Sequence, residues 1–282
     1  METIVKSKTK TVVIGPEHPF TIIGERINPT GRKAFAAELK EGNLERVAYD
    51  AKKQVEAGAH ILDVNVGAAG VDEKKLMKEA CQLLDEITDV PLCFDSSKSD
   101  VLETALKFYE GKALVNSVTG EEERMNAVLP LVKEYGAAVI VLPFGEGGIP
   151  DSADERFRIA ADIVERGEKL GIPREDMVID CLTMTLSSNA AAGKITLDTM
   201  KRIRDELGCN MSLGVSNISF GLPDRETINS VFMVAAIENG LTAAIIDPTK
   251  PEMKKAVLIQ DMLAGKDKHC MTYIRESRKN LS

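Results

Sequence analysis

Short apolar runs recur along the chain, and four of them end in a single polar residue. Those residues are Asp95, Asn116, Asp180 and Asn217. A run without polar positions suits a strand covered on both faces, as in a parallel sheet packed against helices. Because an unpartnered carboxylate or amide is costly to desolvate, their recurrence at strand ends indicates a shared ligand site. Two carboxylates and two amides suit the edge of a flat, nitrogen-rich ligand.

The chain repeats one unit, which consists of an amphipathic helical stretch, a glycine, a short gap and an apolar strand. The glycines stand where a helix would end in the left-handed conformation, at Gly58, Gly111, Gly136, Gly171, Gly208 and Gly240. Two more runs, at 21–25 and 91–95, bring the predicted strands to eight, at intervals of roughly 20 to 40 residues. Helix-spaced apolar stripes lie between them. Pro130 interrupts one stripe, so we expect a kink or a later helix start there.

Eight alternations of strand and helix predict a single (β/α)8 TIM barrel, treated as one domain over residues 1–282. A doubly wound open sheet is the main rival, but no GxGxxG follows the first strand. Residues 1–20 form an N-terminal extension, in which residues 11–14 are expected to make a small strand that plugs the bottom of the barrel. Residues 266–282 form a polar tail without an assigned role. No Pro-, Gly- or Ser-rich linker marks a second domain.

Composition excludes several classes of function. The net charge of −8, the absence of Trp and the aromatic content of 4% argue against nucleic acid as a partner. No apolar stretch reaches the roughly 18 residues of a membrane span, and the start of the chain is polar rather than signal-like. The five cysteines show no CxxC spacing, and Cys93 lies inside a strand run, which favours reduced thiols and a cytoplasmic protein.

The predicted strand ends are rich in Asp, Asn and Glu. Besides the four residues above they carry Glu25, Asn28, Asp63, Asn65 and Asp247. The three histidines lie elsewhere, so no protein-bound metal is expected. No lysine stands at a strand end to form a Schiff base. The site is therefore expected to bind its ligand by hydrogen bonds, without a covalent intermediate.

The same residues also have purely structural interpretations. Asp95 precedes several serines and could cap a helix. Asn116 could satisfy loop backbone, and Asn217 lies in a small polar turn. Asp63 and Asn65 flank a valine and point the same way, an arrangement that would equally brace the barrel mouth.

Six segments, taken in order, resemble the pterin-binding barrels. They are GERIN at Glu25, LDVNVG at Asp63, CFDSS at Asp95, LVNS at Asn116, VIDCL at Asp180 and GVSNISFG at Asn217. The nearest match is the methyltetrahydrofolate:corrinoid protein methyltransferases, whose folate-binding barrel also occurs as a domain of cobalamin-dependent methionine synthase. Each motif alone is weak, but six in the right order at strand ends are specific.

The resemblance implies a role for each site residue. The residues implied to bind the pterin are Asp95, Asn116, Asp180, Asn217, Ser219, Glu25 and Asn28. Asn217 would approach N5, the atom that carries the methyl group, and would act in catalysis with Asp95. The residues implied to support the site are Asp63, Asn65, Arg225 and Asn189. A carboxylate suits a pterin edge because the 2-amino group and the ring N–H can donate two parallel hydrogen bonds to it.

The resemblance also implies a reaction and its partners. The methyl group would move between N5 of methyltetrahydrofolate and the cobalt(I) of a corrinoid, with N5 activated by hydrogen bonding or protonation. Asn217 can donate a hydrogen bond but cannot supply a proton. No DxHxxG cobalamin signature occurs in the chain. The corrinoid is therefore expected on a separate corrinoid protein. Members of the family commonly dimerise, which implies a homodimer.

Two alternatives remain open. Dihydropteroate synthases share the pterin pocket, but that family uses a lysine near strand seven and a Ser-x-Arg segment on the last strand. Here the corresponding stretches, 216–221 and 245–250, read SNISFG and IIDPTK and carry neither feature. The second alternative is a folate-binding subunit without turnover, which the motifs do not distinguish from an enzyme.

Overall fold

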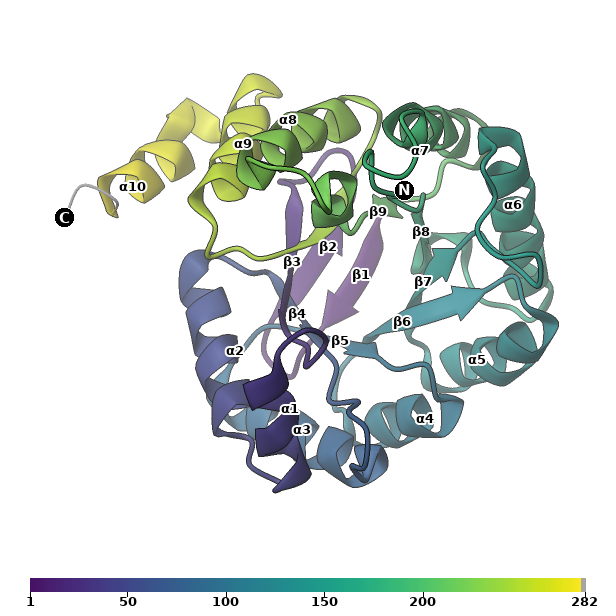
Figure 1. Ribbon diagram of the computed structural model, residues 1–282, viewed down its shortest axis with the longest axis vertical. Helices are drawn as coiled ribbons and strands as arrows, with labels where there is room; N and C mark the ends of the chain where they lie inside the picture. The colour runs from purple at the N-terminus through teal and green to yellow at the C-terminus, as the bar shows by residue number, and fades with distance from the viewer. Residues whose placement is uncertain (280–282) are drawn as a thin grey trace.

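The computed structural model describes residues 1–279, in which eight strands form one barrel ringed by helices (Figure 1). The barrel strands are β3 (Thr21–Ile27), β4 (Ile61–Val64), β5 (Leu92–Asp95), β6 (Leu114–Thr119), β7 (Ala138–Leu142), β8 (Met177–Asp180), β9 (Met211–Ser212) and β10 (Ala243–Ile246). The helices are α1 (Lys33–Lys40), α2 (Glu45–Ala57), α3 (Glu73–Ile87), α4 (Ser99–Phe108), α5 (Glu122–Tyr135), α6 (Ala153–Lys169), α7 (Ala192–Arg202), α8 (Arg225–Glu238), α9 (Pro251–Leu263) and α10 (Met271–Lys279).

The strands run in the order β10-β3-β4-β5-β6-β7-β8-β9, and each neighbouring pair is parallel. The barrel closes between β9 and β10, where the Ile245 N–H donates to the Leu213 carbonyl over 2.9 Å. Gly214 and Ile245 also form a parallel bridge there. The predicted (β/α)8 barrel is confirmed.

A two-stranded hairpin covers the bottom of the barrel. β1 (Thr3–Lys6) pairs antiparallel with β2 (Thr11–Ile14), which confirms the small strand expected at 11–14. Val5, Val12 and Ile14 are buried against apolar side chains of the barrel strands. The Asn210 amide joins hairpin and barrel by donating to the Thr3 hydroxyl and to the Ile14 carbonyl, each over 2.9 Å.

Strand alternation builds the barrel interior in two layers. The lower layer is apolar and packs on the hairpin; it includes Ile23, Ile61, Cys93, Leu114, Ala138, Ile140 and Ala243. Two residues further along four of these strands stand Glu25, Asp63, Asp95 and Asn116, so these side chains face the same interior. The fold therefore places a polar layer directly above an apolar floor. The outward strand residues pack beneath the helices in one continuous core.

Two local expectations differ from the structure. α5 begins at Glu122 and continues through Pro130, so the expected later helix start is wrong. Pro130 lies on the exposed face of α5, where water can solvate the carbonyl that lacks a donor. Gly111 is not left-handed, unlike the other five helix-ending glycines. A Cβ at Gly111 would lie 2.1 Å from the Lys6 carbonyl oxygen, so glycine is required for the close approach of the hairpin.

The polar tail contains structure that its composition did not indicate. A 3-10 turn (Lys268–Cys270) leads into α10, and Lys254 of α9 pairs with Glu276 of α10 over 2.6 Å. Residues 280–282 of the predicted tail lie outside the described residues. Within residues 1–279, no helix combines the length and apolar character needed to cross a membrane.

Candidate functional site

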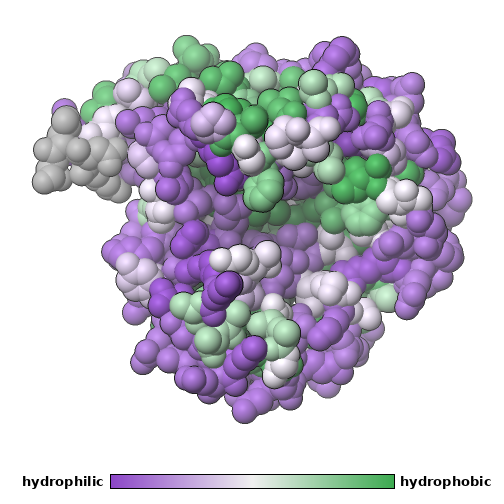
Figure 2. All heavy atoms as spheres, in the orientation of Figure 1, coloured by the Kyte–Doolittle hydropathy of each residue, from purple (hydrophilic) through white to green (hydrophobic). Residues whose placement is uncertain are grey.

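The strands open at their carboxyl ends on a hollow surrounded by loops and helix ends (Figure 2). The polar layer reaches this end, and the strand register brings its members level. Asp95 pairs with Asn116 across β5 and β6, and Asp180 pairs with Ser212 across β8 and β9. Side chains from strands far apart in sequence thus meet at one mouth, where barrels of this type bind their ligands.

Two amide–carboxylate hydrogen bonds link the first half of the mouth. Asn65 Nδ2 donates to Asp95 Oδ2 over 2.9 Å, and Asn116 Nδ2 donates to Asp63 Oδ1 over 3.1 Å. The Asn65 side chain is itself oriented by the Gly67 N–H, which donates to Asn65 Oδ1 over 2.8 Å. Among residues 1–279, Asp95 Oδ1 and Asn116 Oδ1 accept no side-chain hydrogen bond.

Burial raises the pKa values of both carboxyl groups on this half of the mouth. Burial, with the nearby charge of Asp95 adding to it, raises the pKa of Asp63 to about 8. Burial also raises the pKa of Asp95, although the hydrogen bond from Asn65 and the charge of Arg124 oppose the rise. Asp63 is 3% exposed and lies beneath Asn116, so its role in this arrangement is to orient that amide.

Asp180 ends β8 and faces the mouth from a rigid turn. Its Oδ1 accepts the Leu182 N–H over 2.8 Å. Burial raises the pKa of Asp180 to about 6. Hydrogen bonds from the backbone N–H groups of Leu182 and Gly214 and the charge of Arg156 oppose this rise. Leu182 adopts a left-handed conformation, with φ at 61°.

Arg156 is a supporting residue that the sequence analysis missed. It is the largest fully buried side chain, and its guanidinium donates to the carbonyls of Pro150, Cys181 and Leu182 over 2.6 to 2.9 Å. It therefore braces the turn that carries Asp180. Arg156 lies four residues before Ala160 and therefore on the apolar stripe of α6. This spacing is the feature of the sequence that indicates a buried arginine.

Asn217 lies further from its strand than predicted. β9 stops at Ser212, and Asn217 stands in a 3-10 turn, Val215–Ser219, where it is exposed to solvent. Its Nδ2 lies over Gly214, since a Cβ built there would be 3.2 Å from that atom.

Arg225 holds this turn from the first residue of α8. Its Nη2 donates to the Ser216 carbonyl over 2.8 Å, and its Nε donates to Ser219 Oγ over 3.1 Å. Ser219 is fully buried and its hydroxyl is engaged in this contact. Its predicted contact with a pterin stays a prediction. Phe220 is 65% exposed, with its ring near the Arg225 guanidinium.

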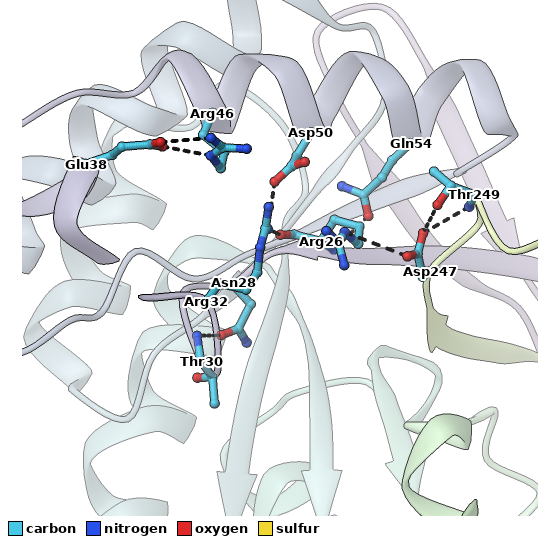
Figure 3. Close-up of polar contacts among 10 residues, drawn as sticks. All are labelled: Arg26, Asn28, Thr30, Arg32, Glu38, Arg46, Asp50, Gln54, Asp247 and Thr249. Carbon is cyan, nitrogen blue, oxygen red and sulfur yellow. Dashed lines mark hydrogen bonds and ion pairs between the residues drawn. The ribbon is translucent and has the colours of Figure 1, made fainter. Parts of the chain in front are cut away.

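Glu25, Arg26 and Asp247 lie together where β10 pairs with β3, and Figure 3 shows Arg26 and Asp247 of this cluster. Asp247 Oδ1 accepts the N–H and the hydroxyl of Thr249 over 3.0 and 2.6 Å, and Asp247 Oδ2 lies 3.7 Å from Arg26 Nε. Burial, followed by repulsion from Asp247, raises the pKa of Glu25 to about 7. Asn28 Oδ1 accepts a hydrogen bond from the Thr30 N–H over 2.9 Å, in a turn after β3.

Three further groups fix the loops around the mouth. Arg32 donates to the Arg26 carbonyl and to Asp50, holding the end of β3. Arg124 donates to the carbonyls of the loops after β5 and β6, at Ser96, Ser97 and Ser117. Asn189 accepts the Ala191 N–H over 2.9 Å and lies 3.5 Å from Asp151, which places it in the loop before α7.

The mouth is rich in hydrogen-bond acceptors and poor in metal-binding groups. In the part of the chain that the structure describes, no three His, Cys, Asp or Glu side chains are placed to hold a metal ion. Inward-facing carboxyl groups stand on β3, β4, β5 and β8. Such an arrangement suits a ligand that presents several N–H donors, with partly protonated carboxyl groups available to exchange protons.

The chain is similar to known proteins over nearly its whole length. A family model described as pterin binding enzyme matches residues 24–247. The chain is 30% identical over 266 residues to a methylcorrinoid:tetrahydrofolate methyltransferase of Eubacterium limosum, covering 92% of this chain and 96% of that protein. It is 30% identical over 262 residues to the methionine synthase of Mycobacterium leprae, covering 88% of this chain and 22% of that protein.

Solved structures show the same architecture. A Yersinia pestis dihydropteroate synthase with a pterin–sulfa conjugate matches with a TM-score of 0.70, over 94% of this chain and 100% of that chain. The sequence identity is 19%, so this likeness shows the fold alone.

Proposed function

The chain belongs to the pterin-binding enzyme family, and from that premise we propose that it moves a methyl group between N5 of methyltetrahydrofolate and the cobalt(I) of a corrinoid. The observation that carries the proposal is the convergence of Asp95, Asn116 and Asp180 at one mouth of the barrel. The Eubacterium limosum relative, whose printed name joins a methylcorrinoid with tetrahydrofolate, supports the choice of reaction.

Recognition of the pterin ring rests on its donor-rich edge. Asp180 and Asp95 would accept the 2-amino group and ring N–H donors, and the Asn116 amide would complete the edge. Charge-assisted hydrogen bonds of this kind contribute about 1.5 to 3 kcal/mol each when water is excluded. The apolar floor beneath, which includes Ile61 and Leu114, is fully buried and would keep water from the ring on the side of the barrel interior.

Methyl transfer requires that charge at N5 be stabilised. When the N5–methyl bond breaks, its electron pair stays on nitrogen, and a donor that strengthens its hydrogen bond at that moment lowers the barrier. Asn217 Nδ2 is such a donor, and Arg225 restricts the turn that carries it. The corrinoid supplies the cobalt nucleophile or the methyl donor, depending on the direction of transfer.

The proposal extends to partners and location. The corrinoid would arrive on a separate corrinoid protein that docks over the mouth and the Asn217 turn. We also propose a cytoplasmic homodimer. Exposed apolar residues gather over α8, α9 and α10, including Val231, Leu263 and Met271, and offer a surface for a second copy (Figure 2).

A rapid-mixing experiment tests the proposed reaction. The purified chain is mixed anaerobically with methyltetrahydrofolate and free cob(I)alamin, and the cobalt(I) absorbance is followed. We expect its loss to depend on both the chain and the folate. Folate binding without any loss of cobalt(I), with free cobalamin and with corrinoid proteins co-purified from the source, would assign the chain as a binding subunit. Sulfa-sensitive formation of dihydropteroate would instead support the dihydropteroate synthase alternative.

A further inference from the structure

We propose that Glu25 is the acid–base group that exchanges a proton with N5 of the folate, while Asn217 orients that nitrogen. This inference rests on the proposed methyl transfer and deepens it by assigning the proton that Asn217 cannot supply. It rests on the position of Glu25 in the barrel, on the charged groups around it, and on the short span between its strand and the Asn217 turn.

Glu25 and the Asn217 turn border the same part of the mouth. Gly214, which begins the turn, bridges Ile245 of β10, and Ile246 of β10 pairs with Gly24 of β3. One strand therefore separates the two elements, a span of roughly 10 Å at ordinary strand spacing. A heterocycle held by Asp180 and Asn116 would place its remaining edge between them.

The neighbours of Glu25 decide where the proton lies. Asp247 has both oxygens engaged, one by Thr249 and the other facing Arg26. Glu25 is not bonded to any side chain among residues 1–279, and it receives only the backbone N–H of Asp247. Burial, with the nearby charge of Asp247 adding to it, raises the pKa of Glu25 and so favours its protonated form.

Burial and the charges around Glu25 set its pKa together. Burial raises the pKa most and the charge of Asp247 at the end of β10 adds to it, whereas the charges of Arg26 on β3 and Arg225 on α8 oppose the rise. The resulting pKa of about 7 lets the carboxyl group both give and take a proton near neutral pH. The arginines would stabilise the carboxylate left after proton donation.

The proposed step balances in both directions. For transfer to cobalt, the Glu25 proton moves to N5, the N5–methyl bond breaks with its electron pair left on nitrogen, and the methyl carbon bonds to cobalt(I). In the reverse direction, the lone pair of N5 would attack the methyl carbon of the methylcorrinoid, the cobalt–carbon bond would break with its electron pair left on cobalt(I), and the N5 proton would pass to the Glu25 carboxylate. Transfer occurs across a hydrogen bond or one bridging water.

Asp63 is the rival proton carrier in the mouth, and its contacts argue against it. It lies beneath Asn116 and accepts that amide, on the half of the mouth that would hold the other pterin edge. Its exposure of 3% leaves it without a path to N5.

The test compares Glu25→Gln with wild type and with Glu123→Gln, an exposed carboxyl group at the first turn of α5. Single-turnover methyl transfer from methyltetrahydrofolate to free cob(I)alamin is measured from pH 5.5 to 8.5. Wild type and Glu123→Gln should slow as the pH rises through about 7, because protonated Glu25 is required. Glu25→Gln should be about 100-fold slower at pH 6 and independent of pH, while binding methyltetrahydrofolate within about threefold of wild type.

Two additional measurements guard against a merely structural effect. Glu25→Asp should restore part of the rate and its dependence on pH. In the infrared difference between wild type and Glu25→Gln, the carbonyl band of a protonated carboxylic acid should titrate near pH 7. Retention of the wild-type rate and pH profile by Glu25→Gln would overturn the assignment and leave the proposed function intact. Absence of transfer by wild type, despite folate binding, would overturn both.

Discussion

Asn65, directly after β4, donates a hydrogen bond to Asp95 at the end of β5, with 2.9 Å between Nδ2 and Oδ2. The bond engages one carboxylate oxygen, Oδ2, and fixes the orientation of the carboxyl group. An adjacent strand thereby converts a freely rotating carboxylate into an oriented acceptor, and the same device recurs between Asn116 and Asp63.

Replacing Asn65 by alanine should therefore weaken folate binding without abolishing it. The loss of one hydrogen bond to a charged group is worth about 1.5 kcal/mol, which corresponds to about a tenfold rise in Kd. Calorimetry with methyltetrahydrofolate measures the effect, with Asn126→Ala on the exposed face of α5 as control. Equal affinities of Asn65→Ala and wild type would show that Asp95 needs no such orientation.

Asp180→Asn should lose tight folate binding. The substitution replaces an acceptor by a donor against a donor-rich ring edge, while the backbone contact of Oδ1 with Leu182 can persist. We expect Kd to rise at least about 100-fold, since two charge-assisted hydrogen bonds are affected. Asp162→Asn, an exposed residue of α6, serves as control in the same titration. An unchanged Kd would remove Asp180 from the pterin site.

Asn217→Ala should slow methyl transfer more than it weakens binding. Removal of one donor to a developing charge typically costs about 10² to 10³ in rate. Because Asn217 is exposed in the free protein, we expect folate affinity to change less than about fivefold. Pre-steady-state rates and calorimetry separate the two quantities. Equal losses in both would assign Asn217 to recognition of the bound folate alone.

Arg225→Leu should reproduce part of the Asn217→Ala defect without touching the folate edge. The variant removes the donors to the Ser216 carbonyl and to Ser219 Oγ, so the turn loses its brace. We expect a transfer rate about tenfold lower and a less ordered turn, detected as faster amide exchange at residues 215–219. If Arg225→Leu showed the amide exchange and the transfer rate of the wild type, the turn would be ordered without Arg225.

Stability should fall with rising pH because of Asp63. The folded-state pKa of Asp63, about 8, lies above its unfolded value. Its contribution to the free energy of unfolding is therefore fully present below about pH 4 and is lost as the pH rises through about 8. Asp63→Asn should flatten the dependence of Tm between pH 6 and 9 by several degrees, at about 3 °C per kcal/mol. Thermal melts without ligand measure this. Parallel curves for the two proteins would contradict a buried neutral Asp63.

The fold could be predicted because its cause is local and periodic. Apolar runs that end in polar residues, helix-spaced stripes and helix-ending glycines each reflect a short stretch of chain, and together they indicate the barrel and its hairpin. The polar mouth followed from the same pattern, since the carboxyl ends of parallel strands must share one end of a barrel.

Supporting contacts depended on residues distant in sequence and could not be predicted in this way. Arg156 reaches the carbonyls after β8, and Arg124 spans two loops. Nothing in the local pattern states which carbonyl a buried arginine will meet, because that depends on how neighbouring βα units pack. The early end of β9 at Ser212 escaped prediction for the same reason.

The order of the residues by itself determined the eight βα units and the set of polar side chains that point into the mouth, because strand alternation assigns each side chain to a face. Only the tertiary structure decided the protonation of those side chains. Glu25 and Asp247 are more than 200 residues apart in the chain, and the pKa of Glu25 is raised by its burial and by the charge of Asp247, which the pairing of β10 with β3 brings close to it.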